Sequence, residues 1–203
     1  MNYIKNSIVQ KKWLVFAGIL WIAYLFFHML TLLNFHQGSE AFNNFYLWYE
    51  DSLLHSLIIL SLILSLVVHV FIALKRQLSN HQANGKTRYA KRYAKRYPGD
   101  IPRFIVFSGV IFLLTFIIFH YIQMELMSRE DLYISLKSVL SEPLFALIYL
   151  LGVTTVTFHM YHGIKNIPLS LGLDHVEFEK TSIVISGAIA IGFLSLFAGV
   201  YYA

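Results

Sequence analysis

Five long stretches of the sequence contain no charged residue, and the polar residues gather in the segments between them. Each stretch has 21 to 23 residues with mainly apolar side chains: residues 13–35, 53–74, 104–124, 143–164 and 181–203. A helix needs about 20 residues to cross a hydrocarbon core of ~30 Å. None of the stretches alternates with a period of two, as strands of a membrane barrel would. The pattern therefore predicts an all-α, polytopic membrane protein with five transmembrane helices.

The composition agrees with this pattern and narrows the class of protein. Only 13% of the residues are charged, whereas a soluble domain carries roughly a quarter. Cysteine is absent, which excludes disulfides, and also iron–sulfur clusters or c-type haem held by cysteines of this chain. We expect a single five-helix transmembrane domain over residues 1–203. We expect no cleavable signal peptide, because the first apolar stretch is too long for one.

Lysine and arginine lie almost entirely on one side of the predicted helices. Fourteen of the sixteen occur in residues 1–12, 75–103 and 165–180, and two occur in residues 36–52 and 125–142. Cytoplasmic segments of membrane proteins carry such an excess of basic residues. We therefore predict a cytoplasmic N-terminus and a C-terminus outside. The net charge of +5 is then a sign of topology rather than of nucleic-acid binding.

The basic cytoplasmic loop, residues 75–103, contains a short repeat. Within residues 88–97, arginine and tyrosine each recur every four residues: Arg88, Arg92 and Arg96, then Tyr89, Tyr93 and Tyr97. On a helix this spacing makes two stripes. Such a helix is suited to lie on anionic membrane lipids or to dock a cytoplasmic partner subunit, and both interpretations stay open.

Histidines carry the candidate chemistry. Six of the nine lie within the predicted spans: His28, His55, His69, His120, His159 and His162. An ionisable residue at membrane depth is a functional-site hypothesis by default. With a rise of 1.5 Å per residue, His28 and His120 lie roughly 22 to 24 Å above the cytoplasmic edge, and His69 and His159 about 8 Å above it. The first and third spans thus offer one histidine each near the outer face, and the second and fourth offer one each near the inner face.

Two such pairs are the ligands that two six-coordinate b haems require. Each neutral imidazole gives one nitrogen to iron and uses its other N–H for orientation. Two haems about 15 Å apart along the membrane normal would form an electron path. A zinc site would need its ligands at one depth, and a di-iron desaturase would need clustered histidine motifs at one face. A proton relay usually includes buried carboxylates, and the five spans contain no Asp or Glu.

The other histidines have secondary interpretations. His162 follows His159 by three residues on nearly the same face, and we prefer His159 as the ligand because its depth better matches that of His69. His162 would then support the inner site or contact a haem propionate. His36 and His55, at the outer ends of the first two spans, are either solvated at the interface or placed to contact quinone or donate a proton.

The order, depth and topology of these histidines resemble the dihaem cytochrome b subunit of succinate:quinone oxidoreductases and fumarate reductases. The likeness runs from about residue 12 to 175. Its segments are Phe-Phe-His-Met-Leu at 26–30, Val-Val-His-Val-Phe at 67–71, Ile-Phe-His-Tyr at 118–121, Phe-His-Met-Tyr-His-Gly at 158–163 and Leu-Gly-Leu at 171–173. The fifth span matches only as an apolar helix.

The resemblance implies a non-catalytic anchor in a bacterial inner membrane, bound to a flavoprotein subunit and an iron–sulfur subunit. Electrons would enter at a His69/His159 haem, pass to a His28/His120 haem, and reach a quinone (menaquinone or ubiquinone) near the outer haem. Basic residues at the cytoplasmic helix ends would pair with inner-haem propionates or simply reach into the interface: Lys75, Arg76, Arg103 and Lys165.

The sequence also departs from the family. Some relatives carry an acidic residue near the outer quinone site at the start of the second helix, where this chain has only Glu50 and Asp51 close by. A membrane-buried glutamate that certain members use for proton transfer on the fourth helix is absent, since residues 154–157 read Thr-Thr-Val-Thr.

Two other functions remain open at this point. One is the dihaem cytochrome b subunit of another respiratory complex, of the nitrate reductase or hydrogenase type, which tends to carry two ligands on one helix. The other is a haem-free transporter or scaffold, which an inverted repeat or broken helices would favour.

Overall fold

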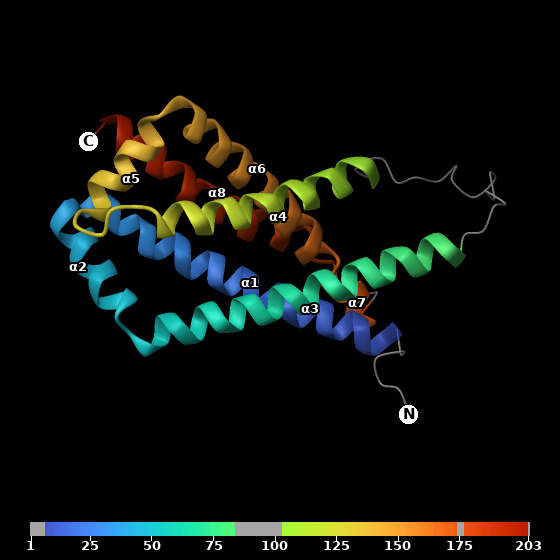
Figure 1. The fold of residues 1–203 in the computed structure, drawn as a ribbon. Coiled ribbons are helices and arrows are strands. Elements are labelled where there is room, and N and C mark those ends of the chain that lie inside the picture. The colour runs from blue at the N-terminus through green and yellow to red at the C-terminus, as the bar shows by residue number, and fades with distance from the viewer. Residues whose placement is uncertain (1–6, 84–102, 174–176, 203) are drawn as a thin grey trace.

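The structure, a computed structural model, describes residues 7–83, 103–173 and 177–202, and these are almost entirely helical (Figure 1). No strand occurs in these ranges. Five helices are long and apolar enough to cross a membrane: α1 (Ser7–Leu32), α3 (Leu53–Ala83), α4 (Arg103–Glu125), α6 (Pro143–Lys165) and α8 (Glu179–Tyr202). The predicted all-α class with five membrane-length helices is confirmed. The repeat at 88–97 lies outside the described residues.

The five long helices lie over the predicted spans, and α1 and α3 extend beyond them. Helix α1 begins at Ser7, six residues before the predicted span. Helix α3 continues to Ala83, nine residues past the predicted end of its span, so it carries part of the basic segment as helix. Helix α6 begins at Pro143, where the missing N–H costs no hydrogen bond. Large apolar side chains are exposed along the outer face of α3, including Leu57, Leu64 and Phe71, as expected for a surface that faces lipid.

Shorter helices lie at the two ends of the bundle (Figure 1). Those at one end are η2 (Leu33–Gln37), α2 (Ser39–Glu50) and α5 (Leu132–Ser141), and α7 (Ile167–Leu171) lies at the other. We refer to these as the outer end and the inner end, following the predicted topology. The hydrophobic pattern predicted only connecting segments at residues 36–52 and 125–142. The structure shows that these segments contain the helices α2 and α5.

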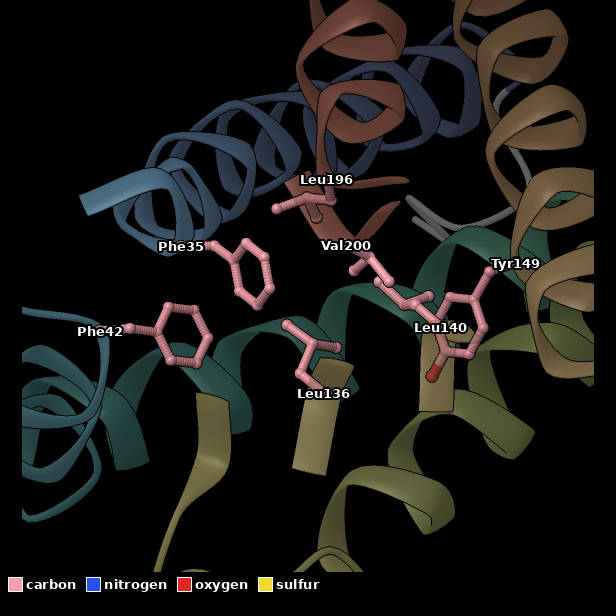
Figure 2. Packing of buried hydrophobic residues seen from close by; sticks show 7 residues of the cluster. All are labelled: Phe35, Phe42, Leu136, Leu140, Tyr149, Leu196 and Val200. Atoms are coloured by element: carbon pink, nitrogen blue, oxygen red, sulfur yellow. The ribbon is translucent and has the colours of Figure 1, made fainter. Parts of the chain in front are cut away.

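An apolar cluster at the outer end holds these short helices on the long ones (Figure 2). Its buried members come from η2, α2, α5, α6 and α8, and we call them the outer cluster: Phe35, Phe42, Leu136, Leu140, Tyr149, Leu196 and Val200. Phe35 is only 1% exposed and stacks on Tyr133 with ring centroids 4.3 Å apart. The stacked rings hold η2 against α5.

A polar junction completes the contact between α2 and α5. The Asp131 carboxylate accepts hydrogen bonds from the Ile134 backbone N–H, at 3.0 Å, and from the Asn43 side-chain amide, also at 3.0 Å. The Asn43 carbonyl oxygen accepts one from the Tyr133 N–H at 2.9 Å. Asp131 is therefore the N-cap of α5. These hydrogen bonds, that of Ile134 first, hold the pKa of Asp131 below its ordinary value of 3.8.

This junction predicts a dependence of stability on pH. A carboxylate whose pKa is depressed by folding contributes stability above its unfolded pKa and loses it as the pH falls through the folded pKa. We expect the thermal midpoint of the purified protein to fall as the pH drops from about 5 toward 3, and to fall less in Asp131→Asn. The matched control is Glu130→Gln, which removes the neighbouring carboxylate but keeps the cap. Equal pH dependence of Asp131→Asn and wild type would contradict the prediction.

Candidate functional site

The four predicted ligand histidines lie close together as two pairs. His28 of α1 and His120 of α4 have ring centroids 6.0 Å apart, with an angle of 60° between the ring planes. His69 of α3 and His159 of α6 have centroids 6.2 Å apart, with an angle of 69°. We call them the outer pair and the inner pair. All four rings are partly buried, and within the described residues no hydrogen bond joins the two rings of either pair.

The pairs form between helices that are not packed along each other. Among the described elements, α1 packs along α3 and α8, and α6 packs along α4 and α8. Helix α1 makes no comparable contact with α4, nor α3 with α6. Each pair therefore consists of two side chains that approach one another across the bundle. The structure brings together the residues that the depth argument predicted to be partners.

The ring separations fit two imidazoles on opposite sides of one metal atom. Imidazole nitrogens bind metals at about 2.0–2.1 Å, and bonds of about 1.33 Å place each ring nitrogen roughly 1.1 Å from its ring centroid. Two opposed ligands then have centroids about 6.3 Å apart. The observed 6.0 and 6.2 Å lie close to this separation. Rings joined by a direct hydrogen bond would lie closer together.

The donor set also fits haem better than a metal held by protein ligands alone. No group of three or more His, Asp or Glu side chains gathers anywhere in the described residues. A six-coordinate haem needs only two protein ligands, because the macrocycle supplies the others. In the inner pair, Nδ1 of His69 is buried without a hydrogen-bond partner, which is rare for a buried polar atom and leaves this ring with a nitrogen to give.

Aromatic rings surround the outer pair. Tyr24 stacks on His28 with centroids 5.5 Å apart and an angle of 5°, and Phe116 stacks on His120 at 5.9 Å and 18°. Phe193 of α8 lies 5.8 Å from His28. Phe116 occupies the space that a Cβ at Gly152 would need, so the glycine lets α4 and α6 approach at this level. The rings exclude water from the pair and restrict its motion.

A short hydrogen-bonded chain orients His120. The Tyr149 hydroxyl donates to Oε1 of Gln123 at 2.8 Å, and its oxygen lies 3.1 Å from Nδ1 of His120. Because the hydroxyl has one proton, it accepts a hydrogen bond from the Nδ1–H of His120. This assigns the proton of a neutral His120 to Nδ1 and leaves Nε2 to act as the ligand. Sequence reasoning missed both Tyr149 and Gln123.

Two glycines, Gly18 and Gly163, lie near the inner pair. A Cβ at Gly18 of α1 would lie 3.8 Å from Cε1 of His69, so α1 passes close to this ring. A Cβ at Gly163, one turn beyond His159, would meet nothing within 4 Å. The backbone at Gly163 is therefore open, one turn beyond His159.

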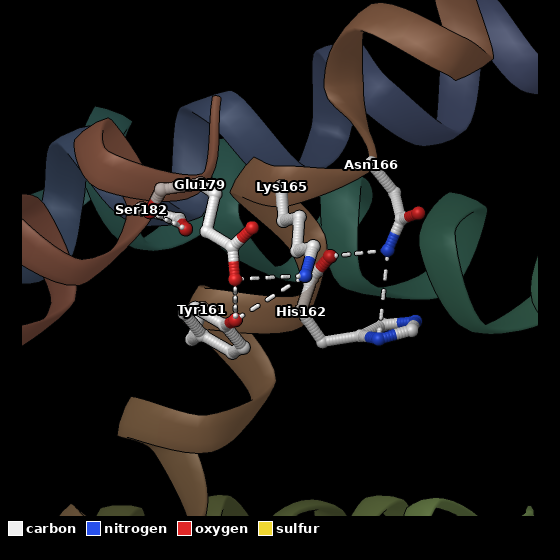
Figure 3. A network of polar contacts seen from close by, with 6 residues as sticks. All are labelled: Tyr161, His162, Lys165, Asn166, Glu179 and Ser182. Atoms are coloured by element: carbon white, nitrogen blue, oxygen red, sulfur yellow. Dashed lines mark hydrogen bonds and ion pairs between the residues drawn. The ribbon is translucent and has the colours of Figure 1, made fainter. Parts of the chain in front are cut away.

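His162 lies in a polar network at the inner end (Figure 3). Its side chain is exposed, and its Nδ1 lies 3.5 Å from the Asn166 amide nitrogen, which also donates to the His162 carbonyl at 2.7 Å. The ring that faces His69 belongs to His159. The geometry therefore favours His159 as the ligand, as the depth argument predicted.

The basic residues at the inner end are not equivalent. Lys165 forms an ion pair with Glu179 at 3.2 Å and lies 3.4 Å from the Tyr161 hydroxyl (Figure 3). Lys75 and Arg76 are half-buried on α3. Arg103 begins α4, but its side chain lies outside the described part. A role for Lys165 at a propionate would thus compete with its pairing to Glu179.

The predicted outer quinone-site residues are also engaged in protein contacts. Glu50 forms an ion pair with Arg129 at 2.6 Å, and Asp51 ends α2, where its backbone N–H bonds to the Leu47 carbonyl at 3.3 Å. His36 Nε2 lies 3.1 Å from the Ser195 hydroxyl on α8. His55 packs against the ring of Tyr49, with centroids 4.9 Å apart. Each of the four residues thus has a different contact partner in the described part of the chain.

No protein-family model, no curated protein and no solved structure matches the chain.

Proposed function

We propose that this chain is a dihaem cytochrome b, in which the outer pair and the inner pair each hold one b haem. One observation carries the proposal: two histidine pairs, on four different helices, have the ring separation of opposed ligands on one metal. Two histidines that bridge helices by bonding to each other would have closer rings, whereas within the described residues the rings of each pair do not bond to one another.

The chain's residues would hold and insulate the two groups. His28 and His120 would supply the ligands of the outer haem, and His69 and His159 those of the inner haem. Bound haem supplies one-electron transfer, which the protein tunes through its ligands and their surroundings. The aromatic rings around the outer pair, Tyr24, Phe116 and Phe193, exclude water and hold the ligand rings in place.

The more specific proposal is a membrane-anchor subunit of succinate dehydrogenase or fumarate reductase. Its support is the resemblance in helix order and histidine depth, together with the single ligand on each of four helices. In a bacterial cytoplasmic membrane, such a chain would carry electrons between an iron–sulfur subunit, itself joined to a flavoprotein, and a membrane quinone. His55 packs on Tyr49 rather than facing a second histidine, which disfavours the arrangement with two ligands on one helix.

A haem spectrum with defined electron donors tests both levels of the proposal. We would purify the full chain in mild detergent with its associated subunits, and record a reduced-minus-oxidised spectrum and a pyridine haemochrome assay. We expect about two b haems per chain, reduced by succinate in the intact complex.

The outcomes separate the candidate functions. A natively folded but colourless preparation would disprove the dihaem proposal and favour a transporter or scaffold. Two haems reduced by hydrogen, or oxidised by nitrate, without any response to succinate or fumarate would keep the cytochrome and overturn the assignment of the complex.

A further inference from the structure

We infer that Tyr149, held by Gln123, is a positioning residue for the ligand His120 and lowers the reduction potential of the outer haem. The inference rests on the proposed function, since it concerns a haem held by the outer pair. It concerns the regulation of that site: two side chains that bind no haem iron would set the electronic character of one ligand.

The direction of the hydrogen bonds carries the argument. The Tyr149 proton is used on Gln123, so the phenol oxygen can only accept from His120 Nδ1–H. Tyr149 comes from α6 and is only 9% exposed, and Gln123 lies three residues after His120 on α4, on the same face. These hydrogen bonds therefore join α4, which carries His120 and Gln123, to α6, which carries Tyr149.

An acceptor on the distal nitrogen changes the ligand itself. As Nδ1–H is drawn toward the phenol oxygen, electron density on the imidazole rises and the ring becomes a stronger donor to iron. A stronger donor stabilises ferric over ferrous iron, so the reduction potential falls. In the inner pair, Nδ1 of His69 is free to bind, the hydrogen bond of this ring is to the Leu14 backbone, and within the described residues no tyrosine hydroxyl bonds to it. The hydrogen bonds of Tyr149 and Gln123 therefore reach a ligand of the outer pair only.

Aromatic contacts hold the Tyr149 ring beside His120. Tyr149 packs edge-on against Phe116 at 5.6 Å and 85°, and Phe116 in turn stacks on His120. The ring of Tyr149 is therefore held by apolar contacts that survive the loss of its hydroxyl. Tyr149→Phe should remove the hydrogen bond while leaving the packing of His120 largely intact.

A potentiometric titration of the purified complex, followed in the reduced-minus-oxidised spectrum, tests the inference. The two haems are first assigned with His28→Ala and His69→Ala. In Tyr149→Phe we expect the equilibrium constant for reduction of the outer haem to rise about tenfold, or about 59 mV for one electron. We expect the inner-haem potential to stay unchanged, and the low-spin electron paramagnetic resonance signal of the outer haem alone to shift.

Two further variants keep the test decisive. Tyr133→Phe removes a phenol hydroxyl from the same region, where the ring stacks on Phe35 rather than on a histidine, and should move neither potential. Gln123→Leu keeps the Tyr149 ring but frees its proton, and should shift the outer potential in the same direction by a smaller factor. If Tyr149→Phe loses the outer haem, Gln123→Leu decides the question.

Failure of the inference and failure of the proposed function give different results. Two haems whose potentials are the same in wild type, Tyr149→Phe and Gln123→Leu would overturn the role of Tyr149 and leave the cytochrome standing. Equal shifts of both haems would also overturn it, because they would report a general change of structure. Absence of haem from the wild-type complex would overturn the proposed function first.

Discussion

Replacement of any one of the four paired histidines by alanine is expected to halve the haem content, from about two to about one b haem per chain. The physical reason is that each pair spans helices that are otherwise not packed together, so a single remaining imidazole holds a haem by one side only. His28→Ala and His120→Ala should remove the same spectral component. His69→Ala and His159→Ala should remove the other. The measurement is a pyridine haemochrome assay per purified chain.

Controls for this prediction are histidines at the outer end that the structure engages elsewhere. His36→Ala and His55→Ala should keep both haems, because His36 bonds to Ser195 and His55 packs on Tyr49. Loss of one component in His28→Ala but of the other in His120→Ala would show that the pairing is wrong. Retention of two haems in all four alanine variants of the paired histidines would show that these histidines are not the haem ligands.

The parts of the structure that follow from hydropathy and helix geometry could be predicted from the sequence. Lipid offers the backbone no hydrogen-bond partner, so an apolar stretch of about 20 residues must be a helix. The regular rise of a helix then converts residue number into depth. Together these rules placed His28 level with His120 and His69 level with His159, and both pairs are found in the structure.

The short helices at the outer end could not be predicted by the same rules. Helices α2 and α5 gain their stability from the outer cluster, where Phe42 and Leu136 pack against residues far away in the chain. Asp131 is a local N-cap signal for α5 through Ile134, but its second partner, Asn43, lies 88 positions earlier in the chain. Contacts between residues so far apart in the chain cannot be predicted from a short stretch of sequence.

The residues that orient the ligand His120 were only partly predictable from the sequence. Gln123 is a polar residue within an apolar span, three positions after His120, and this spacing places it on the same helix face as His120. Tyr149 has no such signal, since it lies on another helix and is one of 13 tyrosines. Side-chain partners across helices depend on rotation of each helix about its axis, which depth alone does not determine.

His159→Ala and His162→Ala are expected to differ sharply, although the two histidines are three residues apart on one helix. His159→Ala should lose the inner haem, because its ring is the one 6.2 Å from the His69 ring. His162→Ala should keep about two haems per chain, because its side chain is exposed beside Asn166 at the inner end. The two variants make a matched pair in composition, helix and depth in the membrane to within about 4.5 Å.

The same pair of variants also separates a ligand from a supporting residue. The haem content of each variant is measured by pyridine haemochrome assay, and the reduced-minus-oxidised spectrum shows which component remains. A full inner-haem signal in His159→Ala together with its loss in His162→Ala would exchange the two assignments. That result would require α6 to turn by roughly 60° from its orientation in the structure, since three residues advance a helix by about 300°. Such a turn would also draw Tyr149 away from His120, so the outer haem would report it as well.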